Sequence, residues 1–430
     1  MTDFAASTGS VRLPPAARIR GAMPWIIWTL GTLTYLVAIV GRSSLAGLGT
    51  GVALRFDAGS TTLALFATLQ LAVYGAMQVP AGLLLDRFGA RAVVTAGMLT
   101  MAGGSIWLAF AGDAPTAIAA RVLTGAGDAM IFPSVLRLLT LWFPPRRVPL
   151  LQQITAQTGQ LGQVVSVIAL TALVELASWE IAFGALAAIF VLFAILDLAL
   201  VRERAVRASS AAAGRPRQGA LVAAAVREPG TRLGFWIHFV TPFAGTAFAL
   251  LWGIPFLTAG EGLSSDTAGL LIVIFVLSGA VFAPVMGLLS GARPAGRPLI
   301  AVVSVVAQAA SFGAILITPG PAPLWLLITW VVTLSSGGAA SMVAFDVARR
   351  DNPLARLSTA TGVVNMGGFI AALIAVYLIG LALDLQHADP AAYTRTELRT
   401  AMSSVFVLWT VGLAGIALEA RRRRRAHGSR

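Results

Sequence analysis

Long runs of apolar residues constrain the fold of this chain more than any other feature of its sequence. A helix of about 20 such residues crosses the hydrocarbon core of a bilayer, which is about 30 Å thick. Only 11% of the 430 residues are charged, against about 25% in a soluble domain. We therefore predict an all-α membrane protein. Its twelve transmembrane helices are expected near residues 25–53, 62–85, 92–111, 116–142, 150–174, 180–201, 234–258, 267–289, 299–317, 324–347, 358–383 and 402–418.

One connection between these runs is much longer than the others. Residues 202–233 are polar, rich in Ala, Gly and Pro, and contain seven Arg, which indicates a cytoplasmic linker between two groups of six helices. The expected division is a cytoplasmic segment over 1–24, six-helix halves over 25–201 and 234–418, and a basic cytoplasmic tail over 419–430.

The distribution of arginine predicts the orientation in the membrane. If the N-terminus is cytoplasmic, 25 of the 31 basic residues, all of them Arg, fall in cytoplasmic segments. Of the other six, three lie within the predicted helices, and only Arg55, Arg395 and Arg399 fall in outer segments, as the positive-inside rule predicts. The net charge of +13 thus suits a membrane surface, and we expect no nucleic-acid partner. We predict a monomer in the cell (inner or plasma) membrane, with both termini in the cytoplasm.

The composition also argues against enzymatic chemistry. The chain has no Cys and three scattered His, so we expect no metal site and no cofactor. No serine–base constellation lies at membrane depth. We therefore predict that the protein is not an enzyme.

The sequence contains an internal repeat. "GLLLDRFGAR" (82–91) follows the second apolar run, and "GLLSGARPAGR" (287–297) follows the eighth. Two related halves are the layout of many secondary transporters, which bind substrate between the halves near the midplane of the bilayer.

The first repeat resembles the loop signature of the major facilitator superfamily, and the resemblance covers nearly the whole chain. It implies the fold of that superfamily and alternating access. Five residues are then expected to gate the cytoplasmic face: Gly82, Asp86, Arg87, Gly89 and Arg91. The glycines would allow close helix approach and a tight turn, and the charged residues would form an ion-pair latch. The alternative is a solvated turn that only obeys the positive-inside rule.

The fourth run is similar to the corresponding segment of the anion:cation symporter branch, which includes sialin and the vesicular glutamate transporters. The matching positions in "RVLTGAGDAMIFPSVLRLLTLWFPP" (121–145) are Arg121, Gly125, Gly127, Asp128, Pro133, Trp142 and Pro144. Arg42, followed by two serines, fits the first helix of that branch, although Gly41 stands where many members have Asp. The resemblance implies transport of a small organic anion coupled to protons.

Arg42 and Asp128 both lie near the centre of their apolar runs. A charge at that depth needs a partner, so we expect Arg42 to face Asp128 or an anionic substrate in a polar cavity. A static ion pair is the alternative. Because a carboxylate can exchange a proton, Asp128 is the candidate for proton coupling. Arg121, two turns before Asp128, is either a second substrate contact or a side chain reaching the outer surface.

Polar side chains at helical spacing complete the expected site. Arg137 is left outside it, as a residue that reaches the surface or pairs with Asp86. We predict that five further residues line the substrate pocket, with hydrogen bonding between helices as the alternative role. They are Tyr74, Gln78, Gln157, Gln160 and Asn365.

Three functions remain open from the sequence. The leading one is a secondary active transporter that moves a small organic anion with protons. Because the apolar runs of the second half carry almost no charge, proton-driven efflux of amphiphilic, drug-like or lipid-like compounds is an alternative. A non-transporting membrane receptor or scaffold is a third, which an intact gate would disfavour.

Overall fold

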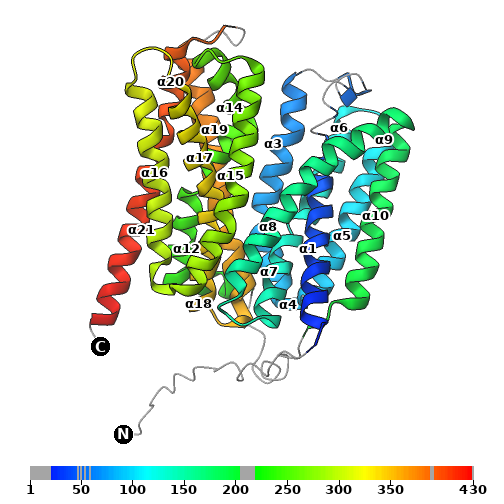
Figure 1. The fold of residues 1–430 in the computed structure, drawn as a ribbon. Coiled ribbons are helices and arrows are strands. Elements are labelled where there is room, and N and C mark those ends of the chain that lie inside the picture. Colours follow the sequence, from blue (N-terminus) through cyan, green and yellow to red (C-terminus); the bar gives the residue numbers. More distant parts are fainter. Residues whose placement is uncertain are drawn as a thin grey trace.

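The computed structural model describes residues 21–45, 48, 51–52, 55–57, 60–203, 218–387 and 392–428. These residues form two helical bundles that stand side by side (Figure 1). Within the described ranges, eleven helical segments are long and apolar enough to cross a membrane. The prediction of an all-helical membrane protein is confirmed.

The first bundle contains the helices of the first half. In chain order they are α1 (Met23–Arg42), α3 (Ser60–Ala76), α4 (Gln78–Phe88), α5 (Ala90–Ala109), α6 (Ala114–Asp128), α7 (Ile131–Trp142), α8 (Val148–Val165), η1 (Ser166–Leu170), α9 (Thr171–Leu176) and α10 (Trp179–Leu200). The face on which α1 begins and α4 and α10 end is called the proximal face here, and the opposite face is called distal.

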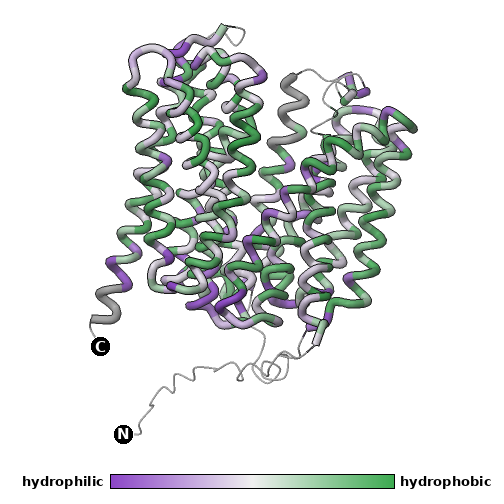
Figure 2. Tube along the Cα trace, viewed as in Figure 1, coloured by the Kyte–Doolittle hydropathy of each residue, from purple (hydrophilic) through white to green (hydrophobic). Residues whose placement is uncertain are grey.

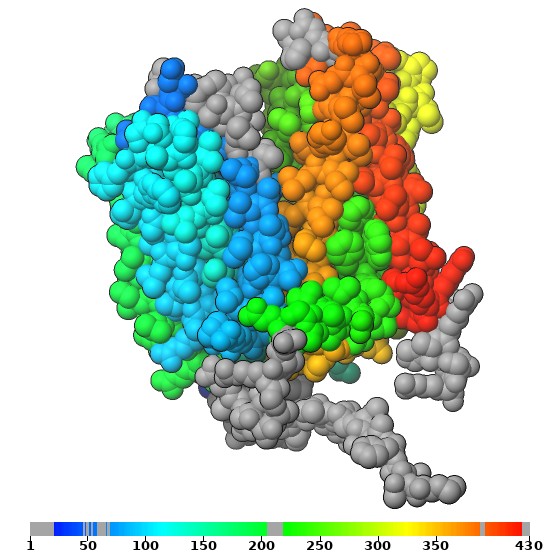
Figure 3. Space-filling model, turned by 180° about the vertical axis from the view of Figure 1, so that it is seen from behind, coloured from blue at the N-terminus to red at the C-terminus, as the bar shows by residue number. Residues whose placement is uncertain are grey.

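The second bundle repeats this arrangement. Its helices are α12 (Pro229–Val240), α13 (Phe243–Ala247), η2 (Phe248–Trp252), α14 (Gly253–Pro255), η3 (Phe256–Gly260), α15 (Ser265–Ala292), η4 (Pro294–Gly296), α16 (Arg297–Ile317), α17 (Leu324–Ser341), α18 (Val343–Asp351), η5 (Leu354–Arg356), α19 (Leu357–Leu385), α20 (Arg395–Ser403) and α21 (Val405–Gly428). In the predicted linker, α11 (Gln218–Arg227) crosses the proximal face between the bundles (Figure 3).

The outer surface of both bundles is apolar. Ile195 on α10 is 58% exposed and Leu277 on α15 is 61% exposed, although both are large hydrophobic side chains. Apolar residues extend along the helices, and hydrophilic residues gather at their ends, most densely at the proximal face (Figure 2). Such a surface matches lipid rather than water.

The first predicted span differs from the structure at its end. We expected a helix over 25–53, but α1 ends at Arg42 and continues as a turn through Leu45. Arg42 is therefore the last residue of its helix rather than a central one. Residues 46–47, 49–50 and 53–54 lie outside the described residues. The second predicted span, 62–85, is helical in α3 and α4, with Met77 between them.

The two bundles meet along a seam in which glycines allow close contact. A Cβ on Gly82 of α4 would lie 2.5 Å from the carbonyl oxygen of Ser358 in α19. A Cβ on Gly287 of α15 would lie 2.8 Å from the Cα of Leu150 in α8. These are the first residues of the two repeats found in the sequence. Each repeat therefore packs one bundle against the other near the proximal face.

Candidate functional site: a buried ion pair and a proximal latch

Arg42 and Asp128 form a two-pronged ion pair in the first bundle. Arg42 Nε donates to Asp128 Oδ2 at 2.6 Å, and Nη2 donates to Oδ1 at 3.0 Å. The Asp128 side chain is fully buried, whereas that of Arg42 is 24% exposed. Asp128 ends α6, midway along the Ala114–Trp142 segment, so the pair lies deep in the bundle. Of the two partners expected for Arg42, the structure places Asp128 there.

Aromatic rings surround this pair. The Arg42 guanidinium carbon lies 4.3 Å from the centre of the Tyr74 ring, within range of a cation–π contact. Tyr74 also lies against Phe369 of α19, with ring centres 4.8 Å apart, so this tilted ring pair joins the two halves. A second tilted pair, between Tyr35 and Phe132, has the same 4.8 Å spacing. Of these rings only Tyr74 was predicted, because a Phe in an apolar helix carries no distinguishing pattern.

Arg121 is buried and holds the end of α1 in place. Its Nη1 donates to the carbonyl oxygen of Gly41 at 3.0 Å and to Ser44 Oγ at 2.8 Å, and its Nη2 donates to the carbonyl oxygen of Arg42 at 2.6 Å. Nη2 also donates to Gln70 Oε1. The last carbonyl groups of a helix lack hydrogen-bond donors within the helix. Because the Arg121 guanidinium donates to two of these carbonyls, α1 can end inside the bundle. Arg121 neither reaches the outer surface nor points to an open space.

The predicted amide residues divide into two groups. Gln78 is buried, donates to the carbonyl oxygen of Tyr74 at 3.1 Å and accepts from Asn365 Nδ2 at 2.7 Å, so this pair links α4 to α19 across the seam. Gln157 is half-buried on α8, and the Gln160 side chain is exposed and accepts from Gln163. The first two therefore bond to each other, whereas the latter two remain on a partly open face.

Asp86 connects the two halves at the proximal face. Its carboxylate accepts from the backbone N–H groups of Ser358 at 3.0 Å and Thr359 at 2.8 Å, and from Thr359 Oγ1 at 2.7 Å. Arg137 Nη1 donates to the same carboxylate at 2.9 Å and to Ser358 Oγ at 2.9 Å. Ser358 and Thr359 open α19, where free N–H groups and the helix dipole favour an anion. We call these four residues the proximal latch.

The other predicted gating residues have different partners from those expected. Arg91 Nε donates to the carbonyl oxygen of Leu198 at 2.8 Å, and the Arg87 guanidinium lies 4.9 Å from the Phe88 ring. Neither contact crosses the seam, so the expected ion pairs of Asp86 with Arg87 and Arg91 are replaced by the Arg137 pair. Gly89 has a φ of +85° in the turn between α4 and α5, a conformation that favours glycine.

A second polar group joins α8 to α18 on the other side of the proximal face. Gln152 Nε2 donates to the carbonyl oxygen of Met342 at 3.0 Å and to Asp346 Oδ1 at 3.3 Å, and Asp346 Oδ2 accepts from Ser290 Oγ at 2.5 Å. Arg349 donates to the same carboxylate. The sequence analysis missed this group because its acid lies at the end of the tenth run rather than in the repeat.

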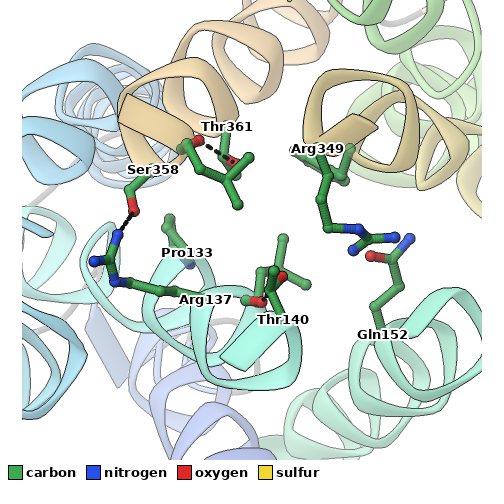
Figure 4. A pocket seen from close by; sticks show the side chains of 10 residues that line it. Pro133, Arg137, Thr140, Gln152, Arg349, Ser358 and Thr361 are labelled. Carbon is green, nitrogen blue, oxygen red and sulfur yellow. Dashed lines mark hydrogen bonds between the residues drawn. The ribbon is translucent and has the colours of Figure 1, made fainter. Parts of the chain in front are cut away.

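A small pocket separates this group from the proximal latch. Its cavity volume is only about 10 Å³, roughly what one water molecule needs. Figure 4 shows Arg137, Ser358 and Thr361 on one side of it and Gln152 and Arg349 on the other. The pocket is enclosed by residues that tie the halves together at the proximal end. It therefore lies among the polar contacts between the halves at the proximal end.

Two lipid-facing helical bundles, related by an internal repeat, joined by polar contacts and holding a buried ion pair, are the architecture of a polytopic membrane transporter. The model of the Major Facilitator Superfamily matches residues 31–376, and the chain belongs to that family. The members of that family are transporters rather than enzymes, in line with the prediction that the chain is not an enzyme.

The curated relatives match only parts of this chain. A quinolone resistance transporter of Acinetobacter baumannii is 32% identical over 26% of this chain and 26% of its own length. A putative tartrate transporter of Agrobacterium vitis is 32% identical over 27% of each chain. Matches to the curated relatives span well under half of their lengths. A crystal structure of a bacterial homologue of the human lysosomal transporter Spinster, in an inward-facing and unoccupied conformation, has a TM-score of 0.61 at 18% identity, covering 93% of this chain and 97% of the other.

Proposed function

We propose that this protein is a proton-coupled transporter of a small organic anion in the cell membrane. In this proposal both termini are cytoplasmic, and α3 and α4 together form a twelfth span. The observation that carries the proposal is the bidentate contact between Arg42 and the buried carboxylate of Asp128. A guanidinium edge that fits one carboxylate fits another, so Asp128 occupies the place that a substrate carboxylate would take.

Protonation of Asp128 is the step that frees Arg42. Once Asp128 is neutral, its hold on the guanidinium weakens, and an anion can take the Nε and Nη2 donors instead. The proton and the anion therefore favour each other's binding, which is the relation that symport needs. With Asp128 ionised, Arg42, Arg121 and Asp128 sum to one positive charge. One bound anion and one proton restore that same sum.

The contacts between the halves support alternating access. Gly82 and Asp86 bind α19 near its first turn, and Gly287 packs on α8 near its first turn, so these contacts lie towards the proximal face. We assign the structure to an outward-facing state with a closed cytoplasmic gate. Opening that gate requires breaking the bonds of Asp86 to α19.

The test is uptake by purified protein in proteoliposomes. An inward proton gradient should concentrate a labelled organic anion inside the vesicles, and a protonophore should abolish the accumulation. Anion binding to the protein in weakly buffered detergent should also take up protons from solution. Accumulation that ignores the proton gradient, or binding that releases protons, would contradict the coupling.

Export of amphiphilic compounds is a second candidate. The relative named as a quinolone resistance transporter favours it, as does the apolar ring of Phe369, which the second bundle places against Tyr74 beside Arg42. Proton-driven extrusion of a lipophilic cation from inverted vesicles would support this alternative. The same vesicles would then fail to bind anions at Arg42.

A further inference from the structure

We propose that the substrate is a monoanion with a flat, apolar body, of the class of aromatic monocarboxylates. This inference rests on the proposed function and names the substrate class of the same site. It follows from the way in which the polar and aromatic groups around Arg42 are already used.

The first step concerns the number of cations that can hold the substrate. Among the described residues, the cations buried near Asp128 are Arg42 and Arg121. The Nη1 and Nη2 groups of Arg121 already donate hydrogen bonds to the end of α1, to Ser44 and to Gln70, and the residue is only 4% exposed. Of these two cations only Arg42 is partly exposed, so the site can neutralise one carboxylate but not two.

The second step concerns hydroxyl groups. A polyhydroxylated substrate needs several free donors and acceptors in the pocket, because its own hydroxyls are otherwise left unpaired. In the second half, Asn365 donates to Gln78, and His238 Nδ1 bonds to the carbonyl oxygen of Ser341 at 3.2 Å. Gln308 donates to the carbonyl oxygen of Thr241 and to Ser304. Gln308 Oε1 has no hydrogen-bond partner among the described residues, but the other groups named here are already hydrogen-bonded within the protein. These three residues of the second half therefore offer few free donors and acceptors to a substrate.

The third step concerns the rings. Tyr74 lies under the Arg42 guanidinium and against Phe369, and Tyr35 lies against Phe132, whose ring centre is 6.2 Å from that of Phe345 in α18. The Tyr74–Phe369 and Phe132–Phe345 contacts cross between the halves, so the rings border the place where the halves separate. A planar ring held by its carboxylate on Arg42 can insert between them, since aromatic pairs prefer offset or edge contacts.

The experiment compares four acids by binding to the purified wild-type protein at pH 5.5 and 7.5. The probes are phenylacetate, cyclohexylacetate, gluconate and tartrate. We expect phenylacetate to bind at least ten times more tightly than gluconate or tartrate, and more tightly at the lower pH. Cyclohexylacetate, which has the same charge but no aromatic face, should fall between them.

A matched pair of variants tests the ring contact. Phe369→Leu should weaken phenylacetate about 2- to 10-fold and leave cyclohexylacetate within about 2-fold, as expected for an aromatic pair. Phe110→Leu, on a side chain that is 73% exposed at the end of α5, should change neither. A melting temperature near that of the wild type would show that Phe369→Leu folds.

Two results would overturn the inference in distinguishable ways. If tartrate or gluconate binds with proton uptake and phenylacetate does not, the substrate class is wrong and the proton-coupled anion function stands. If none of the four acids binds at either pH, the proposed function fails together with the inference.

Discussion

The carboxylate of Asp128 lies edge to edge with the guanidinium of Arg42, with hydrogen bonds of 2.6 and 3.0 Å. Each group ends a helix inside the bundle, α1 at Arg42 and α6 at Asp128. The pair therefore joins two helix ends, one of which Arg121 also holds through the carbonyl oxygens of Gly41 and Arg42. A paired charge in that place suits an exchange of partners.

Arg42→Lys should reduce anion uptake at least ten-fold. Lysine keeps the charge but cannot offer two parallel N–H donors to one carboxylate. Arg55→Lys is the matched control, because Arg55 pairs with Glu180 at an exposed position. Initial rates in proteoliposomes with equal protein content provide the measurement. Wild-type uptake by Arg42→Lys would remove Arg42 from the substrate site.

Asp86→Asn should open the proximal gate more often. The substitution removes the charge that faces Arg137 and the first turn of α19, where each charge-assisted hydrogen bond contributes about 1.5–3 kcal/mol. Because the chain has no Cys, spin labels can be placed at the exposed positions Ala92 and Ala355. The distance between them should lengthen in Asp86→Asn and stay unchanged in Asp113→Asn. An unchanged distribution in Asp86→Asn would refute the latch.

Gly82→Ala should open the same gate by sterics alone. The new Cβ would lie 2.5 Å from the Ser358 carbonyl oxygen and 2.8 Å from the Thr359 Cα, so α4 and α19 could not close as they do here. Gly184→Ala is the control, since nothing lies within 4 Å of its Cβ. The same pair of labels reports the result. If the label distance in Gly82→Ala equals that of the wild type, α4 and α19 accommodate the extra methyl group without opening, and the prediction is wrong.

Arg121→Gln should lower stability more than it alters substrate selectivity. The shorter amide cannot reach the Gly41 and Arg42 carbonyls together with Gln70, and each buried group left unpaired costs about 1–3 kcal/mol. The melting temperature in detergent should fall, while the folded fraction keeps its affinity for anions. A normal melting temperature with lost anion binding would instead make Arg121 a substrate contact.

The sequence predicts most of the spans and the need of Arg42 for a buried partner, because both follow from the high cost of polarity in lipid. It left open whether that partner is Asp128 or a substrate. It also identifies Gly82 and Gly287, because the repeat places them at equivalent positions. It could not predict the end of α1, since the apolar run continues beyond Arg42 and the group that ends the helix, Arg121, is far away in the chain. The partners of Asp86 in α19 could not be predicted either. They include backbone N–H groups at the start of that helix, which every non-proline residue has and which no sequence pattern identifies.

The most direct test of the account is Asp128→Asn, assayed in the same proteoliposomes by proton-driven uptake and by counterflow without a gradient. If Asp128 carries the coupling proton, concentrative uptake should be lost, while binding and counterflow exchange remain, because exchange needs no deprotonation. If Asp128 only balances Arg42, the variant leaves an unpaired buried cation, which costs about 3–5 kcal/mol. Loss of uptake, counterflow and binding together, with a lowered melting temperature, would contradict the coupling role and leave Asp128 a structural partner of Arg42.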